Sequence, residues 1–191
     1  MGLALRVREK LPEILIEACS VALAVLLALW ANEWSDERKL RQQSAALEAA
    51  VDAELRSNLA DLEGSRSQLR AAIGEARRYL DPAGAGMRSL RFDVGLSLLS
   101  EAAFRTAQSS DAVQRLDTGW RIEAARAYEL QALYERQQEA LLDTLNGIVS
   151  DTGVQPASAS VRTAELRLRT MLELNQQLAG QYRALLARSP R

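Results

Sequence analysis

The sequence predicts an all-α protein, in which an N-terminal transmembrane helix continues into a long amphipathic helix and an antiparallel helical bundle follows. Three observations lead to this fold class: an apolar run, apolar residues recurring every three or four positions through most of the remainder, and a composition rich in helix-forming residues. We expect a short basic tail over residues 1–10, a transmembrane helix over 11–34 and a helical bundle domain over 35–191.

The apolar run over residues 11–31 is long enough to cross a bilayer. As a helix it would span about 31 Å, close to the hydrocarbon core of about 30 Å. Its leucine, isoleucine and valine residues each favour insertion by roughly 0.3 to 0.6 kcal/mol. Glu13 and Glu17 interrupt the run near one edge, where a charge costs less than at the centre, so insertion is expected to win.

The flanks of the run carry residue types that anchor helices at membrane interfaces. We expect this role for Arg6, Arg8, Lys10, Trp30, Asn32 and Trp34. The N-terminal positive charges lie closer to the run than those that follow it, which favours an N-terminus inside the cell and a bundle outside the cytoplasm. Two alternatives are a cleaved signal peptide ending near Ala31 and a buried helix of a soluble protein; the length of the run argues against both.

One face of the predicted transmembrane helix carries small and polar residues. They recur at three- and four-residue steps, as Glu13, Glu17, Ser20, Ala24, Ala28 and Ala31. Small residues let membrane helices approach closely, and ionisable groups inside a membrane usually face protein. The stripe therefore indicates self-association or docking on a partner membrane protein. The alternative is that alanine is merely common here and that Glu17 reaches the interface.

Beyond the membrane, apolar periodicity predicts helices over about 35–80, 97–109, 112–150 and 159–188. A Pro- and Gly-containing segment starting at Asp81 ends the first of them. Residues 90–98 alternate like a strand, but no second strand candidate exists, so an extended lead-in to the second helix is expected. Asn175 falls in the apolar stripe of the last helix; a solvated edge position is expected, and a buried register-setting position is the alternative.

Part of the N-terminal pattern resembles an uncharacterised bacterial membrane family, described only as a domain of unknown function. The resemblance is carried by Glu17, Ala28, Leu29, Asn32, Trp34, Glu37, Arg38 and Lys39, and more loosely by residues 102–110 and 128–135. Ser35 and Asp36 replace more usual polar residues, and Trp30 is an added aromatic. The resemblance implies a single-pass, helical, membrane-anchored protein, and it implies no activity. The expected location is the bacterial inner (cytoplasmic) membrane, and the flanking charges favour a bundle in the periplasm.

The composition argues against several classes of function. A net charge of -1 offers no basic face for nucleic acid. The absence of histidine excludes Ser-His-Asp and Cys-His nucleophiles and the usual zinc and di-iron sites. Cys19 is the only cysteine, so no disulfide can form within the chain. We therefore expect no enzymatic activity, no metal and no cofactor.

Two functions remain as expectations. The first is a membrane-anchored interaction or scaffolding module that contacts lipid and associates with itself or with a partner membrane protein. The alternative is a sensory or ligand-binding bundle that signals through a partner protein, with a small-molecule ligand that the sequence does not identify. For that alternative, the aromatic residues that could line a pocket are Phe104, Trp120, Tyr128 and Tyr134. The alternative for these residues is ordinary core packing, which is the more common role of aromatic side chains in a helical bundle.

Overall fold

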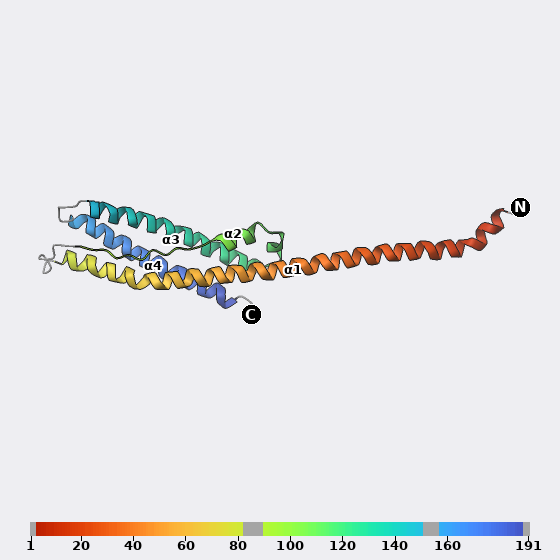
Figure 1. Cartoon of the computed structure of the whole chain (residues 1–191), viewed down its shortest axis with the longest axis horizontal. Helices are drawn as coiled ribbons and strands as arrows, with labels where there is room; N and C mark the ends of the chain where they lie inside the picture. Colours follow the sequence, from red (N-terminus) through yellow and green to blue (C-terminus); the bar gives the residue numbers. More distant parts are fainter. Residues whose placement is uncertain (1–2, 82–89, 151–156, 189–191) are drawn as a thin grey trace. The chain divides into compact units, whose positions relative to one another are not determined.

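The computed structural model is all-α over the residues that it describes (Figure 1). Its elements are α1 (Leu3–Leu80), α2 (Ala102–Gln108), the 3₁₀ helix η2 (Asp111–Arg115), α3 (Thr118–Ser150) and α4 (Ser158–Arg188). The backbone is described for residues 3–81, 90–150 and 157–188, and the side chains for residues 19–81, 90–148 and 157–188. No strand occurs among these residues, in agreement with the predicted fold class.

Contacts along the chain divide it into two compact units, Met1–Ala45 and Ala46–Arg191. The first unit consists of the N-terminal part of α1. The second contains the rest of α1 together with α2, η2, α3 and α4, and it holds the hydrophobic core.

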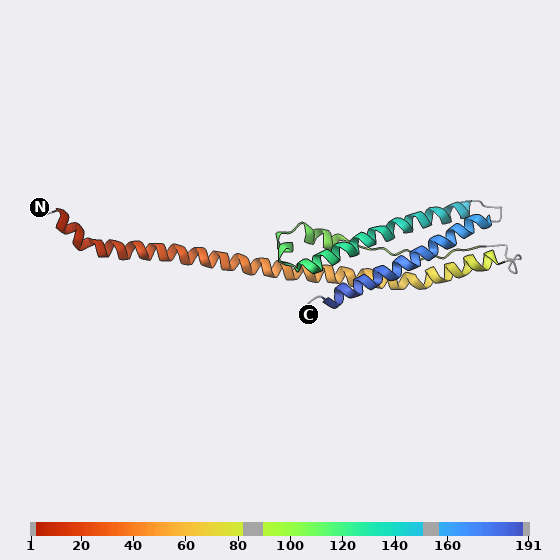
Figure 2. The ribbon, with the colours of Figure 1, turned by 180° about the vertical axis from the view of Figure 1, so that it is seen from behind.

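Three long helices build the second unit, and their directions follow from their contacts (Figures 1 and 2). Glu63 and Arg77 of α1 pair with Arg183 and Glu165, so α4 runs antiparallel to α1. Glu54 and Asn58 of α1 contact Tyr128 and Gln131 of α3 in the same order, so these two helices run parallel. They can do so because residues 90–101, which we call the strap, carry the chain back along the bundle in an extended conformation.

In α1 and α4 a row of buried positions alternates at steps of three and four residues, with a few further buried residues beside it. This gives a period of about 3.5 rather than the 3.6 of a straight helix, which is the packing pattern of left-handed coiled coils. In α1 these positions are Val51, Leu55, Asn58, Leu62, Ser65, Leu69, Ala72 and Ala76, and in α4 they are Val161, Ala164, Leu168, Met171, Asn175, Leu178, Tyr182 and Leu185. The fold therefore resembles a four-stranded coiled coil in which the strap occupies the fourth place.

The middle of the chain departs from the predicted helices. The helix expected over 97–109 is limited to α2, because side chains of the bundle hold the backbone of Ser97 and Ser100 in the extended strap. The helix expected over 112–150 is divided into η2 and α3. Leu116 is extended between them, with φ -71° and ψ 147°, and α3 begins where Asp117 Oδ1 accepts a hydrogen bond from the Trp120 amide at 2.7 Å.

The transmembrane helix predicted over 11–34 is not found. Among the residues whose side chains are described, no helix is both long enough and apolar enough to cross a bilayer. Residues 11–18 of the predicted span, which include Glu13 and Glu17, lie outside those residues, and so do Arg6, Arg8 and Lys10.

Candidate functional site

The richest polar chemistry of the bundle lies inside it, where the strap meets α1, α3 and α4. We call this group the polar seam. It consists of Glu54, Asn58, Ser65, Gln131, Tyr134, Asn175 and Tyr182 from the helices and Ser97 and Ser100 from the strap. The helix residues of the seam are all at least nine-tenths buried. Buried polar groups in such numbers must satisfy one another, and they do so in two sets of hydrogen bonds, one around Ser97 and one around Ser100.

Two side-chain amides hold the strap in the way that a neighbouring strand would. Asn58 Oδ1 accepts from the Ser100 amide at 2.9 Å, and Asn58 Nδ2 donates to the Ser100 carbonyl at 2.7 Å. Gln138 does the same for Ser97, at 3.1 and 3.3 Å. Each amide thereby satisfies both backbone groups of one strap residue, so the strap needs no partner strand.

Gln131 belongs to the set around Ser100 and makes hydrogen bonds with both ends of its amide. Its Oε1 accepts from Tyr182 at 2.6 Å and from Asn58 Nδ2 at 3.4 Å. Its Nε2 donates to Glu135 at 2.9 Å and to the Ser100 carbonyl at 3.3 Å. Burial raises the pKa of Tyr182. This tyrosine therefore stays a neutral donor, linking α4 to α3.

Asn175 is fully buried, so the expectation of a solvated edge position is wrong and the register-setting alternative is supported. Its Nδ2 donates to the Leu62 carbonyl at 2.8 Å and to Ser65 Oγ at 3.2 Å. Its Oδ1 accepts from Arg66 Nε at 3.1 Å. A shift of α4 along α1 would leave these groups unpaired, and a buried asparagine in a coiled coil acts on register in this way.

Glu54 joins α1 to the start of α2. It accepts four hydrogen bonds, from Tyr128 OH and Ser100 Oγ at 2.7 Å each and from the amides of Ala103 at 2.9 Å and Phe104 at 3.3 Å. Burial raises the pKa of Glu54, but these hydrogen bonds outweigh it, so that the net pKa lies below the ordinary value of 4.5. The carboxylate therefore acts as an N-terminal cap for α2 that is supplied by another helix.

The four predicted pocket aromatics do not gather in one place. Phe104 and Tyr128 stack with ring centroids 4.1 Å apart and planes 6° from parallel, and Tyr134 OH lies 3.1 Å from Ser97 Oγ in the seam. Phe104 and Trp120 do share a cavity, of about 360 Å³, between α2, η2 and the start of α3. The complete lining is Phe104, Ala107, Gln108, Val113, Leu116, Trp120 and Arg121.

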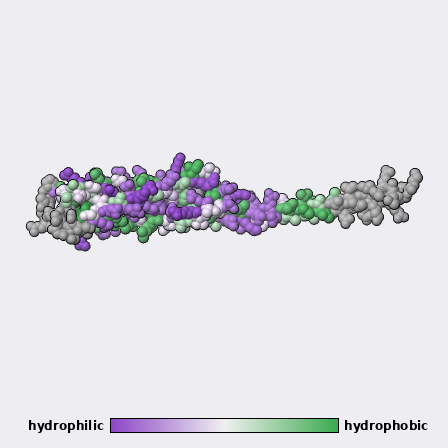
Figure 3. Space-filling view, turned by 90° about the horizontal axis from the view of Figure 1, so that it is seen from above, coloured by the Kyte–Doolittle hydropathy of each residue, from purple (hydrophilic) through white to green (hydrophobic). Residues whose placement is uncertain are grey.

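The predicted membrane-helix residues with described side chains, namely Ser20, Ala24, Ala28, Ala31, Trp30, Asn32 and Trp34, are all exposed on α1. Figure 3 shows the stretch from Cys19 as a hydrophobic band. Charged and amide side chains follow the band and contact one another. Asn32 Nδ2 donates to Asp36 at 3.3 Å, and the guanidinium of Arg38 lies 5.8 Å from the ring centroid of Trp34.

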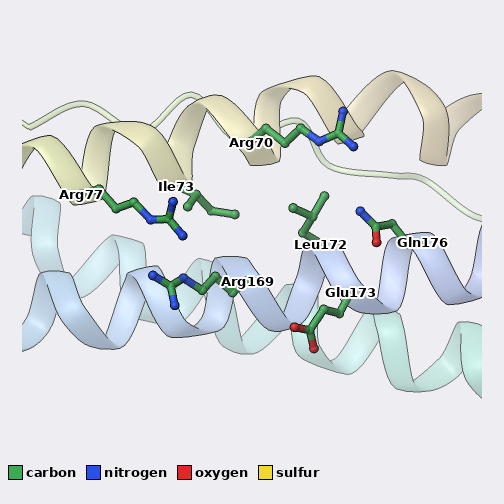
Figure 4. A pocket seen from close by; sticks show the side chains of 7 residues that line it. All are labelled: Arg70, Ile73, Arg77, Arg169, Leu172, Glu173 and Gln176. Carbon is green, nitrogen blue, oxygen red and sulfur yellow. The ribbon is translucent and has the colours of Figure 1, made fainter.

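A second groove, of about 380 Å³, lies between α1 and α4, with Ile73 and Leu172 among its lining residues (Figure 4). Arg77 and Arg169 face each other across it, and both bind Glu165 Oε1, at 2.9 and 2.5 Å. Burial raises the pKa of Glu165, but its two arginine partners lower the pKa by a larger amount. The net pKa is therefore below the ordinary value. Two of the three arginines that line the groove, Arg77 and Arg169, are thus already paired within the protein.

The described residues contain no group of three or more Cys, Asp or Glu side chains arranged to hold a metal ion. Comparison with protein-family models, with curated proteins and with solved structures gave no match to this chain. The likeness of residues 17–39 to an uncharacterised membrane family therefore stays a prediction.

Sequence reasoning missed the polar seam, although part of its signal was present. Asn58, Ser65 and Gln131 occupy positions in the three-and-four pattern at which an apolar residue is the norm. Polar residues at such core positions predict buried hydrogen-bonding groups, which is what the seam contains. Glu54 carried no such signal, because it stands outside that pattern and next to Leu55.

Proposed function

We propose that this chain is a single-pass, membrane-anchored helical module that holds its bundle beside a bilayer and acts through contacts with other protein chains rather than through catalysis. The observation that carries the proposal is the uncovered apolar surface of α1 between Val21 and Leu29. The large apolar side chains there are 53–62% exposed.

These side chains point to all sides of α1, because successive residues of a helix are turned by about 100°. A helix that is apolar all round belongs in a protein core or in a membrane. Water is a poor solvent for such a surface, and a contiguous apolar patch of this kind marks an interaction site. Together with residues 11–20, the exposed stretch completes an apolar run of membrane-spanning length.

The residues that follow the band support an interfacial position. Trp30 and Trp34 are 67% and 59% exposed, as tryptophans at a headgroup layer would be. After them, Asp36 pairs with Lys39 at 3.2 Å and Glu37 with Arg41 at 2.9 Å, so charged side chains surround α1 here. The change from an apolar band to a charged band within a few residues is the pattern expected where a helix leaves a bilayer.

Substitution of Leu26 by arginine tests the anchor. A charge in the middle of the band opposes insertion, so we expect Leu26→Arg to lower the fraction of protein retained in membranes after a carbonate wash. Leu98→Arg is the matched control, since Leu98 is an 81% exposed leucine of the bundle, and its retention should equal that of the wild type. Wild-type protein recovered as a dispersed species in the detergent-free supernatant would overturn the proposal.

Self-association through the small-residue face is tested separately. We expect Ala24→Leu with Ala28→Leu to lower the oligomer mass measured by light scattering in mild detergent, because the larger side chains prevent close helix approach. Ala22→Leu is the control, because Ala22 lies on the opposite face of α1 within the same apolar band. Equal masses for the two variants and the wild type would show that the stripe does not mediate association.

A further inference from the structure

We propose that α1 pairs in parallel with α1 of a second copy of this chain, through a row of small residues on the outer face of the bundle. We call these residues the outer row, and all of them are exposed. They are Ala50, Ala53, Ser57, Ala60, Gly64, Ser67 and Ala71. The inference concerns the bundle alone and does not depend on the membrane anchor.

The outer row has the spacing of a coiled-coil interface. Its members alternate at steps of three and four residues, as the buried row of α1 does. With a period of 3.5, each residue is turned by about 103° from the one before, which places the outer row about 150° around α1 from the buried row. From Ala50 to Ala71 it extends about 32 Å, which is long enough for about three heptads of a partner helix.

The small size of these side chains is specific to this face of α1. The exposed row of α3 has the same spacing but carries large side chains, namely Arg126, Glu129, Leu133 and Arg136. The outer row is also open at its centre, since a Cβ added to Gly64 would meet no other atom of the described chain within 4 Å. How closely two helices approach depends on the side chains between them, and a row of small residues allows close packing along its whole length.

The charges that flank the outer row identify the partner as a second copy. One edge of the row carries Arg56 and Arg70, and the other edge carries Asp61 and Glu75. In a parallel coiled coil, a residue on the first edge lies beside the partner's residue five positions further along the opposite edge. Arg56 would then meet the partner's Asp61, and Arg70 the partner's Glu75. Two-fold symmetry makes each of these pairs occur twice.

The orientation of the two copies follows from the same residues. Between the two charged pairs, Glu63 would meet the partner's Gln68, which brings no like charges together. Antiparallel pairing would place each edge against itself, so that Asp61 and Glu75 would face a second acidic edge. Figure 4 shows that the Arg70 side chain lies along α1 rather than across the groove toward α4. Opposite charges therefore favour the parallel arrangement.

Cysteine cross-linking of the full chain in mild detergent tests this arrangement. In a Cys19→Ala background, we expect Ala53→Cys, Ala60→Cys and Ser67→Cys each to give a disulfide-linked dimer under mild oxidation. Parallel helices bring every residue of the row next to its own copy, whereas antiparallel helices do so at one point only. Arg136→Cys, on the exposed row of α3, is the control and should give at least about fivefold less dimer.

Charge reversal tests whether the flanking residues select the partner. With the Ala60→Cys cross-link as the readout, Arg70→Glu and Glu75→Arg should each lower the dimer yield about threefold, because each brings like charges together twice. The two reversals combined restore opposite charges and should return the yield to that of the parent. The proposal is overturned if the row cysteines cross-link no more than Arg136→Cys, if only one of them cross-links, or if the single reversals leave the yield unchanged. It is equally overturned if the combined reversal does not recover the yield.

Discussion

Glu54→Ala is expected to lower the free energy of unfolding of the bundle by about 4 kcal/mol, because it leaves four donors without an acceptor. Two of these donors are amides in the first turn of α2, so we expect this helix to lose its amide protection first in hydrogen exchange. Urea unfolding of the full chain in mild detergent, followed by circular dichroism, measures the overall loss.

Two further variants isolate the contribution of the charge of Glu54. Glu54→Gln keeps the shape but places an amide NH₂ against donors, so it should be destabilised by about 2 kcal/mol. Glu139→Gln alters an exposed carboxylate of α3 and should change stability by less than about 0.5 kcal/mol. A Glu54→Ala protein as stable as the Glu139→Gln control would contradict the capping role.

The same carboxylate gives the bundle a pH dependence with a definite sign. The pKa of Glu54 is lower in the folded chain than its ordinary value of 4.5. Its contribution is therefore fully present above about pH 4.5 and is lost as the pH falls through the lowered folded-state pKa. Glu54→Gln should lack this part of the acid-induced loss of stability, so its unfolding free energy should fall less between pH 5 and pH 3 than that of the wild type.

Gln131→Leu is expected to lower the free energy of unfolding by about 3 kcal/mol, since it removes all four hydrogen bonds of the Gln131 amide. The substitution leaves the hydroxyl of Tyr182, which is fully buried, without its Gln131 acceptor. Tyr182→Phe alone should cost about 1 kcal/mol, because it removes one hydroxyl and leaves the ring packed.

The double variant distinguishes a connected network from independent contacts. In Gln131→Leu with Tyr182→Phe, the stranded hydroxyl is gone, so the loss should be smaller than the sum of the two single losses by about 1 kcal/mol. Leu133→Ala is a control on the exposed side of α3, and its effect should add to that of Tyr182→Phe without coupling. Strict additivity of Gln131→Leu and Tyr182→Phe would show that their hydrogen bond contributes nothing to stability.

The long helices could be predicted from the sequence because their apolar residues repeat regularly. The helix expected over 159–188 corresponds to α4, Ser158–Arg188, and the break expected after Leu80 is where α1 ends. These results depend on local periodicity and on turn residues, which act within a few positions of one another.

The strap and the candidate site depended on contacts between distant residues. Ser97 and Ser100 suit a helix as well as a loop, and the amides that hold them extended come from positions more than thirty residues away. The pairing of Phe104 with Trp120 in a cavity, and of Tyr134 with the strap, is likewise set by how the helices pack. The sequence indicated which aromatic residues were candidates, but only the packing separates two that line the cavity from two that do not.

The distance between two residues of the strap matches the distance between the two residues of α3 that bind them. Ser97 and Ser100 are three residues apart, and the amides that bind them on α3, Gln138 and Gln131, are seven apart. Three extended residues cover about 10 Å, and seven helical residues cover about 10.5 Å. One step of the strap thus matches one heptad, and a slip of a single residue would detach both serines from their amides together.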